Sequence, residues 1–343
     1  MTNAKASAGN PHISVIILNW NGCQDTLECL ASLRRVDYPN FTTVVVDNGS
    51  TDGSLDSITR EFPDVVLLPT GTNLGYAGGN NAGIRWALDQ GTDYILLLNN
   101  DTVVAADLLW TFRLAVAQVP PGSVLGAKIY FYDQPDTLWF AGGRWDPNYS
   151  QFEHIGYGLK DSCPSTAFVE VDYITGCALF TAATTFRTVG LLDERFFLTY
   201  EETDWCYRAR SHGYKCILVP GAKVWHKVSS SFGGKDSPLV VYFQTRNKLL
   251  WARKHASIPL QWKIHRQALT DLAEILFPPL SWSLDPVPLA KKLTWSLATW
   301  VKTVARRKAD PVNRAILFAL RDYYLGRLGN CSDEVRALLN PGT

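Results

Sequence analysis

Short apolar runs alternate with segments of helical spacing along the first hundred residues of the chain. The apolar runs have the length of buried strands, and polar residues follow each of them. Such β-α-β-α alternation with short connections predicts an α/β fold with a mostly parallel central sheet covered by helices. The expected strands are residues 13–19, 42–48, 65–69 and 94–98, and the expected helices are residues 23–33, a segment ending at Ile58, and residues 82–88.

The rest of the chain has a different pattern. Residues 120–170 are richer in Pro, Gly and aromatic residues, which predicts loops and short strands of mixed direction. A strand is expected at 171–180 and a helix at 201–212. From about Pro238 onward the chain predicts Trp-, Lys- and Arg-rich helices, broken at Pro278–Pro279 and near Pro286–Pro288. We therefore expect a flexible N-terminus over residues 1–10, an α/β domain over 11–238 and a helical region over 239–343.

The composition is that of a folded protein, with 46% hydrophobic and 19% charged residues among 343. A net charge of +1 argues against a nucleic-acid partner. The charge is uneven, because residues 246–327 hold 15 Lys or Arg against 5 Asp or Glu. Helices rich in basic residues and Trp suit an anionic membrane surface, although a helical cap that packs its Trp residues is the plainer alternative. The Trp residues are Trp262, Trp282, Trp295 and Trp300.

Seven cysteines show no CxxC pair and no spacing fit for zinc, so we expect reduced, structural thiols. The N-terminus has no apolar signal-peptide core, and no apolar run reaches the ~18 residues of a membrane span. These features predict a cytoplasmic protein, or one peripheral on the inner face of the cell membrane.

Polar residues follow the apolar runs, where ligands of parallel sheets bind. At the end of the second run, a carboxylate at Asp47 can accept an N–H from a pyrimidine ring. At the end of the fourth, Asp101 can hold a divalent cation that bridges two phosphates, since such an ion needs only one or two carboxylates. Turn formation and helix capping are the structural alternatives for these polar clusters.

Two further segments carry candidate chemistry. The glycines of NLGYAGGNNAGIRWAL (73–88) permit close backbone approach to a ligand, or close packing of a helix on the sheet. Glu201, Glu202 and Asp204 open an expected helix, where acidic residues are also stabilised by the helix dipole. Three carboxylates in four residues exceed what capping requires. Arg208 and Arg210 are placed to brace these carboxylates or to bind phosphates.

The order of ISVIILNWNG, VVVDNGSTDGS, NLGYAGGNNAGI and LLLNNDT resembles glycosyltransferase family 2, the inverting enzymes of GT-A fold. The resemblance covers roughly residues 12–255 and is closest to bacterial rhamnosyltransferase-like O-antigen and cell-wall transferases. It implies transfer of one sugar, with rhamnose favoured, from a dTDP- or UDP-linked donor. The implied acceptor is a hydroxyl of a glycan or of a polyprenyl-linked oligosaccharide.

The resemblance also implies roles for single residues. Asp101 becomes the main carboxylate ligand of Mg²⁺ or Mn²⁺, because Asn99 replaces the family's first Asp, and His226 completes the metal site. Glu202 occupies the position of the catalytic base, with Asp204 as its rival, and Ser229–Gly234 is an expected lid. Gly176 and Cys177 are expected near the sugar and acceptor, and Arg246 and Asn247 near the acceptor or phosphates. The expected donor-binding residues are Asn19, Asn21, Asp47, Asn48, Gly75, Gly78, Asn80, Asn99, Asn100 and Arg208.

Other functional classes fit the sequence less well. A nucleotidyltransferase would carry a Gly-rich run and a basic residue after the first strand, where this chain has ILNWNG. A dehydrogenase would carry GxGxxG after a strand. A non-catalytic sugar- or lipid-binding subunit that keeps the fold would be expected to lose Asp101 or the acidic cluster, and both are present.

Overall fold

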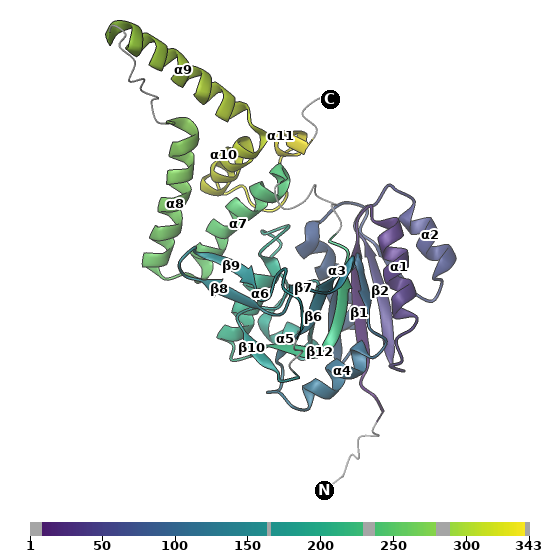
Figure 1. The fold of residues 1–343 in the computed structure, drawn as a ribbon. Helices are drawn as coiled ribbons and strands as arrows, with labels where there is room; N and C mark the ends of the chain where they lie inside the picture. Colours follow the sequence, from purple (N-terminus) through teal and green to yellow (C-terminus); the bar gives the residue numbers. More distant parts are fainter. Residues whose placement is uncertain (1–8, 163–165, 229–236, 279–288, 340–343) are drawn as a thin grey trace. The chain divides into compact units, whose positions relative to one another are not determined.

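The computed structural model describes residues 9–162, 166–228, 237–278 and 289–339 (Figure 1). The chain divides into two compact units, Met1–Ser229 and Ser230–Thr343. The boundary expected near 235–240 lies just after this division, partly outside the described residues. The expected lid at Ser229–Gly234 and most of the expected flexible N-terminus also lie outside them.

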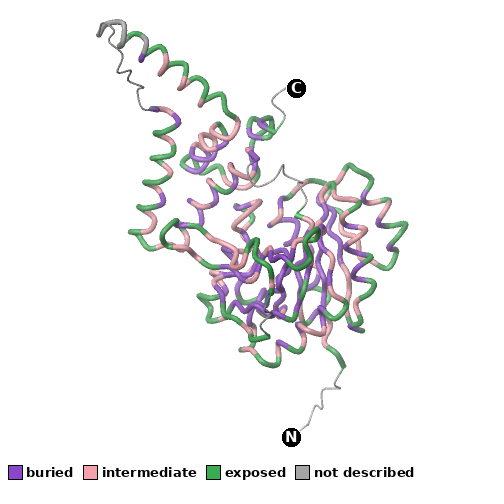
Figure 2. Tube along the Cα trace, in the orientation of Figure 1, coloured by how far each residue is buried: buried purple, intermediate pink, exposed green. Residues whose placement is uncertain are grey.

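Four parallel strands form one half of the main sheet, in the order β4-β1-β2-β3. The central Val, Ile and Leu residues of β1, β2 and β4 are fully buried, which fits strands covered on both faces (Figure 2). The strands and the helices that connect them are β1 (Ile13–Asn19), α1 (Cys23–Leu33), β2 (Phe41–Asp47), α2 (Ser54–Glu61), β3 (Val66–Pro69), α3 (Gly75–Asp89) and β4 (Tyr94–Asn99).

The other half of the sheet has mixed direction. β11 runs antiparallel between β4 and β6, while β12 is parallel to β6 and antiparallel to β5 and β10. A separate two-stranded sheet pairs β8 with β9. The elements are β5 (Thr102–Val104), α4 (Leu108–Val116), β6 (Val124–Phe131), β7 (Gln134–Phe140), β8 (Gly143–Asp146), β9 (Gln151–His154), β10 (Val169–Val171), β11 (Ala178–Ala182), α5 (Ala183–Val189), α6 (Glu201–Ser211) and β12 (Cys216–His226).

Two expected elements differ from the structure. The strand expected at 171–180 is two strands, because residues 172–177 cross from the edge strand β10, which pairs with β12, to β11 in the sheet interior. The helix expected at 82–88 already begins at Gly75. Its glycines pack on the sheet: a Cβ at Gly83 would lie 2.5 Å from Ile16, and one at Gly79 would overlap Leu18. Close helix–sheet packing therefore accounts for part of this glycine-rich segment.

The second unit is helical in its described part. Ser237 and Asp310 cap α7 and α10 by accepting hydrogen bonds from the backbone N–H groups of Val240 and Asn313, and Pro follows each cap. Among the described residues, no helix is both long enough and apolar enough to cross a membrane. The elements are α7 (Pro238–His255), α8 (Ile258–Leu276), α9 (Leu289–Ala309), α10 (Pro311–Tyr324), α11 (Asp333–Arg336) and a 3₁₀ turn at Ala337–Leu339.

Candidate active site

The polar ends of β1, β2 and β4 lie side by side at one edge of the sheet, because β1 pairs in parallel with both β2 and β4. The parallel register pairs Asn19 with Asp47 and places Asn99 beside Leu18. The predicted strand-end residues are therefore brought together, at the edge where ligands of parallel sheets bind.

Asp47 and Asn19 form a buried hydrogen-bond network at this edge. Asn19 Nδ2 donates to Asp47 Oδ1 at 2.9 Å, and the Ser50 backbone N–H donates to Asp47 Oδ2 at 3.1 Å. Asp47 is 1% exposed. Asp47 thus ties β1 to the turn after β2 through one hydrogen bond to each carboxylate oxygen, and its contact with a pyrimidine base stays a prediction.

Asn21 and Asn48 shape the loops above this network. Asn21 has a left-handed backbone (φ 51°), and its Oδ1 accepts a hydrogen bond from Thr51 N at 2.7 Å. Asn48 Oδ1 accepts from Leu74 N at 2.9 Å, and its Nδ2 donates to the Gly75 carbonyl at 3.1 Å. Both side chains fix loops that line the nucleotide-binding edge expected from the sheet topology.

The remaining residues that were expected to bind the sugar donor lie on α3, at the end of β4 and directly after it. They too contact other groups of the protein. Asn80 Nδ2 donates to the Tyr76 carbonyl at 2.9 Å, and a Cβ at Gly78 would lie 2.8 Å from the Leu74 side chain. Asn100 Nδ2 donates to Thr26 Oγ1 at 3.0 Å. Asn99 N donates to the Cys177 carbonyl at 3.1 Å.

Asp101 and His226 form the pair expected to hold a metal. His226 Nε2 lies 3.0 Å from Asp101 Oδ1, and their side chains are 8% and 9% exposed. The pairing of β5 with β12 places His226 opposite Thr102, and Lys227 N donates to the Asp101 carbonyl at 2.9 Å. The buried Nδ1 of His226 has no hydrogen-bond partner among the described residues. A carboxylate and an imidazole here suit a divalent cation that takes its other ligands from phosphates and water.

The described residues contain no cluster of three or more His, Cys, Asp or Glu side chains fit for a metal. Within this part of the chain, such an ion would therefore find at most two His, Cys, Asp or Glu side chains at one place. That is the usual arrangement for an ion that arrives with a phosphate ligand.

The acidic helix α6 begins after a segment of unusual backbone. Phe197, Thr199 and Tyr200 have left-handed φ values of 65°, 64° and 72°. Such conformations in residues with a Cβ cost about 1–3 kcal/mol each and cluster at functional sites. The sequence pattern gave no sign of this strain, because none of these residues is Gly or Asn.

The three carboxylates of α6 occupy different environments. Glu201 is 3% exposed, and burial followed by the charge of Glu202 raises its pKa well above the usual value. Burial also raises the pKa of Glu202, while the backbone N–H groups of Glu202, Thr203 and Gly176 oppose that rise. Asp204 is fully buried, and its Oδ2 accepts from Arg208 Nε at 3.0 Å. Asp204 therefore braces an arginine.

Arg208 holds backbone carbonyls in this structure. Its guanidinium donates to the carbonyls of Val189 at 2.8 Å and Leu191 at 2.6 Å. The expectation that it binds the donor therefore finds no support in its contacts, since its donors face the turn after α5.

Tyr76 contacts the backbone directly before β11, and it was not among the residues predicted from the sequence. Its hydroxyl donates to the Gly176 carbonyl at 2.8 Å. Burial, and then the charges of Glu202, Glu201, Cys177 and Asp101, raise its pKa well above the usual value. The charges of the acidic helix and of Asp101 therefore both act on the Tyr76 hydroxyl.

Gly75 and Gly176 leave room for the close contacts that Phe197 and Tyr76 make. The Phe197 carbonyl accepts hydrogen bonds from Tyr76 N at 2.6 Å and Ala77 N at 3.3 Å. A Cβ at Gly75, whose φ is +72°, would overlap Phe197, and one at Gly176 would overlap the Tyr76 hydroxyl. Both glycines thus permit close packing around the site. From the sequence they were expected to lie near the ligand.

Lys227 is another residue of this region that was not predicted from the sequence. It follows His226, and its Nζ lies 2.9 Å from Asp25 Oδ1 and 2.5 Å from Glu28 Oε2 on α1. It therefore ties the end of β12 to α1 beside the metal pair. Lys227 lies 202 and 199 residues from Asp25 and Glu28 in the sequence, so no local motif indicates these contacts.

Arg246 and Asn247 lie on α7 in the second unit. Both are fully buried, and Arg246 Nε donates to Asn247 Oδ1 at 3.0 Å. Arg246 also donates to the Tyr242 hydroxyl at 3.3 Å, and that hydroxyl donates to Asp322 on α10 at 2.9 Å. Within their unit these residues join two helices, so their contacts give no support to the expected acceptor or phosphate role.

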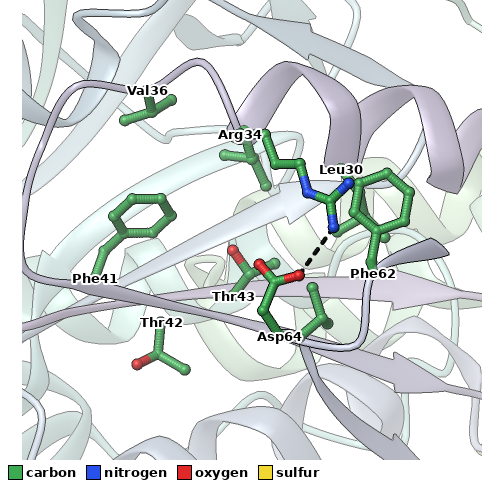
Figure 3. A pocket seen from close by; sticks show the side chains of 10 residues that line it. Leu30, Arg34, Val36, Phe41, Thr42, Thr43, Phe62 and Asp64 are labelled. Carbon is green, nitrogen blue, oxygen red and sulfur yellow. Dashed lines mark hydrogen bonds and ion pairs between the residues drawn. The ribbon is translucent and has the colours of Figure 1, made fainter. Parts of the chain in front are cut away.

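A separate pocket of about 360 Å³ lies at the opposite, amino end of β2 (Figure 3). Arg34 covers it, with its guanidinium 4.0 Å from the centre of the Phe62 ring and 2.9 Å from Asp64 Oδ1. Phe41 and Thr42 line its floor, and the site residues of β2 lie at the other end of the strand. This pocket is therefore not part of the candidate active site.

Comparisons with known proteins agree with this geometry. Residues 14–175 match the model of "Glycosyl transferase family 2". An N-acetylglucosaminyl-diphospho-decaprenol L-rhamnosyltransferase of Mycobacterium tuberculosis is 26% identical over 68% of this chain and 83% of its own length. The dTDP-rhamnosyl transferase RfbF of Shigella flexneri is 24% identical over 78% of this chain and 86% of its own.

A solved structure gives the same fold. The mannosyltransferase PcManGT of Pyrobaculum calidifontis, in complex with GDP-Man and Mn²⁺, superposes with a TM-score of 0.54. The match covers 93% of this chain and 89% of the other at 16% identity. The predicted GT-A fold, with its mostly parallel sheet and helical C-terminal region, is thereby confirmed.

The buried Glu201 predicts a pH-dependent stability. A carboxyl whose pKa is higher in the folded chain contributes stability below the unfolded pKa and loses it as the pH rises through the folded pKa. Glu201→Gln removes this titration, so from about pH 4, near the pKa of an unfolded Glu, to about pH 9 its Tm should fall less than that of the wild type. Thermal unfolding across this range measures it, with the half-exposed Glu61→Gln as control. Parallel Tm curves for wild type and Glu201→Gln would contradict the assignment.

Proposed function

Residues 14–175 form a glycosyltransferase family 2 domain, and from this premise we propose that the chain transfers rhamnose from dTDP-rhamnose to a hydroxyl of a lipid-linked glycan. The sugar and the acceptor class are supported by the names of the two relatives above. The observation that carries the proposal is the Asp101–His226 pair, 3.0 Å apart, together with Glu202, whose charge acts with that of Asp101 on the Tyr76 hydroxyl. Inverting transfer needs a base for the acceptor hydroxyl and stabilisation of the charge on the leaving diphosphate, which a cation held by this pair would supply.

Asp101 and His226 would hold a divalent cation, Mg²⁺ or Mn²⁺, together with the donor diphosphate. The Nε2 of His226, 3.0 Å from the Asp101 carboxylate, fits such an ion, and the buried Nδ1 of the same ring makes no hydrogen bond within the described part of the chain. When bound, the ion neutralises negative charge on the nucleoside diphosphate as it leaves. Asn21 and Asn48 would hold the loops that surround the nucleotide, and Asp47 would support them from below.

Glu202 acts as the base in this proposal. Its carboxylate takes the proton of the acceptor hydroxyl as that oxygen attacks the anomeric carbon. The bond to the diphosphate oxygen breaks on the opposite face, so the configuration inverts. The raised pKa of Glu202 makes it a stronger base near neutral pH than an exposed Glu, while the rate should fall as the pH drops through that pKa.

The second unit would contact the membrane that carries such an acceptor. α8 exposes Ile258 (72%), Trp262 (73%) and Leu269 (51%), which are spaced on one face of the helix. Trp262 and Leu269 border a groove of about 450 Å³ together with Lys263 and Arg266. Apolar side chains flanked by cations are typical of helices at anionic lipid surfaces. Trp282 and the side chains of Trp295, Lys291 and Lys292, which the sequence also suggested, lie outside the described part.

The metal assignment predicts the effects of two substitutions. Asp101→Asn should lower transfer by at least ~10²-fold and remove metal-dependent binding of dTDP, because the neutral amide is a poor ligand for a hard cation. His226→Ala should weaken metal affinity less severely. Transfer and dTDP affinity are measured with and without EDTA. Full activity of Asp101→Asn in EDTA would refute the assignment.

The base assignment separates two neighbouring carboxylates. Glu202→Gln should retain dTDP binding and lose transfer by ~10²–10⁴-fold. Asp204→Asn should cost more stability than catalysis, because it breaks the buried ion pair with Arg208. Transfer rate, dTDP affinity and Tm are measured for both variants side by side. If Asp204→Asn is inactive and Glu202→Gln turns over normally, the roles must be exchanged.

The membrane proposal predicts sedimentation with anionic vesicles at low salt. Trp262→Ser should reduce binding to phosphatidylglycerol vesicles about tenfold or more, since burying a large apolar side chain contributes about 1.5–3 kcal/mol. The matched control is Leu114→Ser, at a 60% exposed position on α4 of the first unit, and should bind like the wild type. Failure of the wild type to bind such vesicles rejects the proposal.

A further inference from the structure

A layer of aromatic rings begins at the metal pair and has no role in the chemistry described above. Trp139 on β7 lies with its ring centre 4.5 Å from that of His226, at an interplanar angle of 78°. Its ring centre also lies 4.5 Å from that of His154 on β9, at an interplanar angle of 70°. Trp139 is partly exposed, and its indole N–H makes no hydrogen bond to a described residue. A partly exposed indole beside a metal pair is available to a ligand.

The layer continues outward to an exposed tyrosine. The Tyr157 ring lies 6.4 Å from His154 and 5.5 Å from Phe131, and the residue is 54% exposed. His154 bridges Trp139 and Tyr157, and burial lowers its pKa to about 4, so the bridge is neutral. The outer end of the layer therefore presents a phenol to solvent.

The layer also continues toward the helix that carries the proposed base. His154 lies 6.3 Å from Tyr173, and Tyr173 lies 5.3 Å from Phe152. Phe152 in turn packs edge-on against Tyr200, the residue before α6, at 6.0 Å. These packed rings connect the metal pair to the residue before α6, although Tyr173 itself is only 4% exposed. A molecule that contacts the exposed part of Trp139 is therefore beside the metal pair, on rings that also hold the start of α6.

Core packing explains aromatic rings that are fully buried. It does not explain why Trp139 and Tyr157 keep exposed surface. Phe112 and Phe180 stack in the core at 4.8 Å and are fully buried. Trp139 and Tyr157 retain exposed surface, although their neighbours hold them in place. Rings that are held rigidly and partly exposed are typical of binding sites, where an apolar surface with a few polar groups orients the ligand.

The position of the layer identifies its ligand. The nucleotide-binding edge is formed by β1, β2 and β4. Trp139 lies instead on β7 in the mixed half of the main sheet, and His154 and Tyr157 lie on β9 of the separate two-stranded sheet and in the turn after it. The molecule that rests there is therefore the acceptor. A lipid tail would favour a wholly apolar surface, but this one offers an indole N–H and a phenol O–H. A pyranose ring, with C–H groups on its faces and hydroxyls at its rim, matches both features.

We propose that Trp139 and Tyr157 form a shelf on which a pyranose ring of the acceptor stacks, with its attacking hydroxyl directed toward Glu202. This rests on the proposed glycosyl transfer and adds which residues select the acceptor. The aromatic faces bind the C–H face of the sugar, and the indole N–H donates to a ring-edge hydroxyl. The two residues position the acceptor, while proton transfer stays with Glu202.

The test is saturation-transfer NMR on the full chain with Mn²⁺ and dTDP present. The probes are methyl glycosides of rhamnose, galactose and N-acetylglucosamine. The wild type should bind at least one of them, and Trp139→Leu and Tyr157→Leu should each weaken that binding by ~5- to 10-fold. Trp139→Phe, which keeps a ring, should restore most of the affinity. The control Tyr149→Leu, at a 68% exposed position, should bind like the wild type.

The affinity for dTDP, measured in parallel by calorimetry, separates this proposal from the proposed function. The shelf is supported if glycoside binding falls while dTDP affinity stays within about twofold. It is overturned if the wild type binds none of the glycosides, or if both Leu variants bind them normally. A loss of dTDP affinity in Trp139→Leu would place the nucleotide on these rings and also overturn it. Wild-type protein that neither binds dTDP nor turns over dTDP-rhamnose would instead refute the proposed function.

Discussion

The antiparallel pairing of β5 with β12 places the two expected metal ligands side by side. The register sets His226 opposite Thr102, and the bond from Lys227 N to the Asp101 carbonyl continues the ladder by one step. A slip of one residue would turn His226 to the other face of the sheet. Since β12 is also parallel to β6, its position is fixed from two sides. The Asp101–His226 distance of 3.0 Å, the ring contact with Trp139 and the ion pairs of Lys227 all depend on this register.

A second constraint joins this pair to the acidic helix. The Phe197 carbonyl is held by the first N–H groups of α3, and the Tyr76 hydroxyl is bonded to the Gly176 carbonyl. The left-handed residues before α6 let the chain turn sharply enough to place Glu201 and Glu202 in the interior. The cost of this strain is offset by the packing at Gly75, where a side chain would leave no room for Phe197. The proposed base is thus positioned by the same helix that borders the nucleotide edge.

The sequence alone predicts the strands and helices that depend on the local pattern of apolar and polar residues. Continuous apolar runs gave β1, β2 and β4, and the acidic cluster gave the start of α6 at Glu201. Side-chain direction at the strand ends could not be predicted in the same way. Asp47 accepts a hydrogen bond from the Ser50 backbone N–H, and Arg208 donates one to the Val189 carbonyl. Both contacts form only in the folded chain. The residues before α6 and the ring layer at Trp139 depend on tertiary packing and have no periodic signature.

The central claim is that Asp101 and His226 bind one divalent cation together with the donor diphosphate. Electron paramagnetic resonance of Mn²⁺ with dTDP tests it most directly, using full-length protein that contains ¹⁵N-labelled histidine. The account predicts a nitrogen coupling that is lost in His226→Gln, and tighter Mn²⁺ binding when dTDP is present. Bound Mn²⁺ without nitrogen coupling, or dTDP affinity unchanged by EDTA, would contradict it.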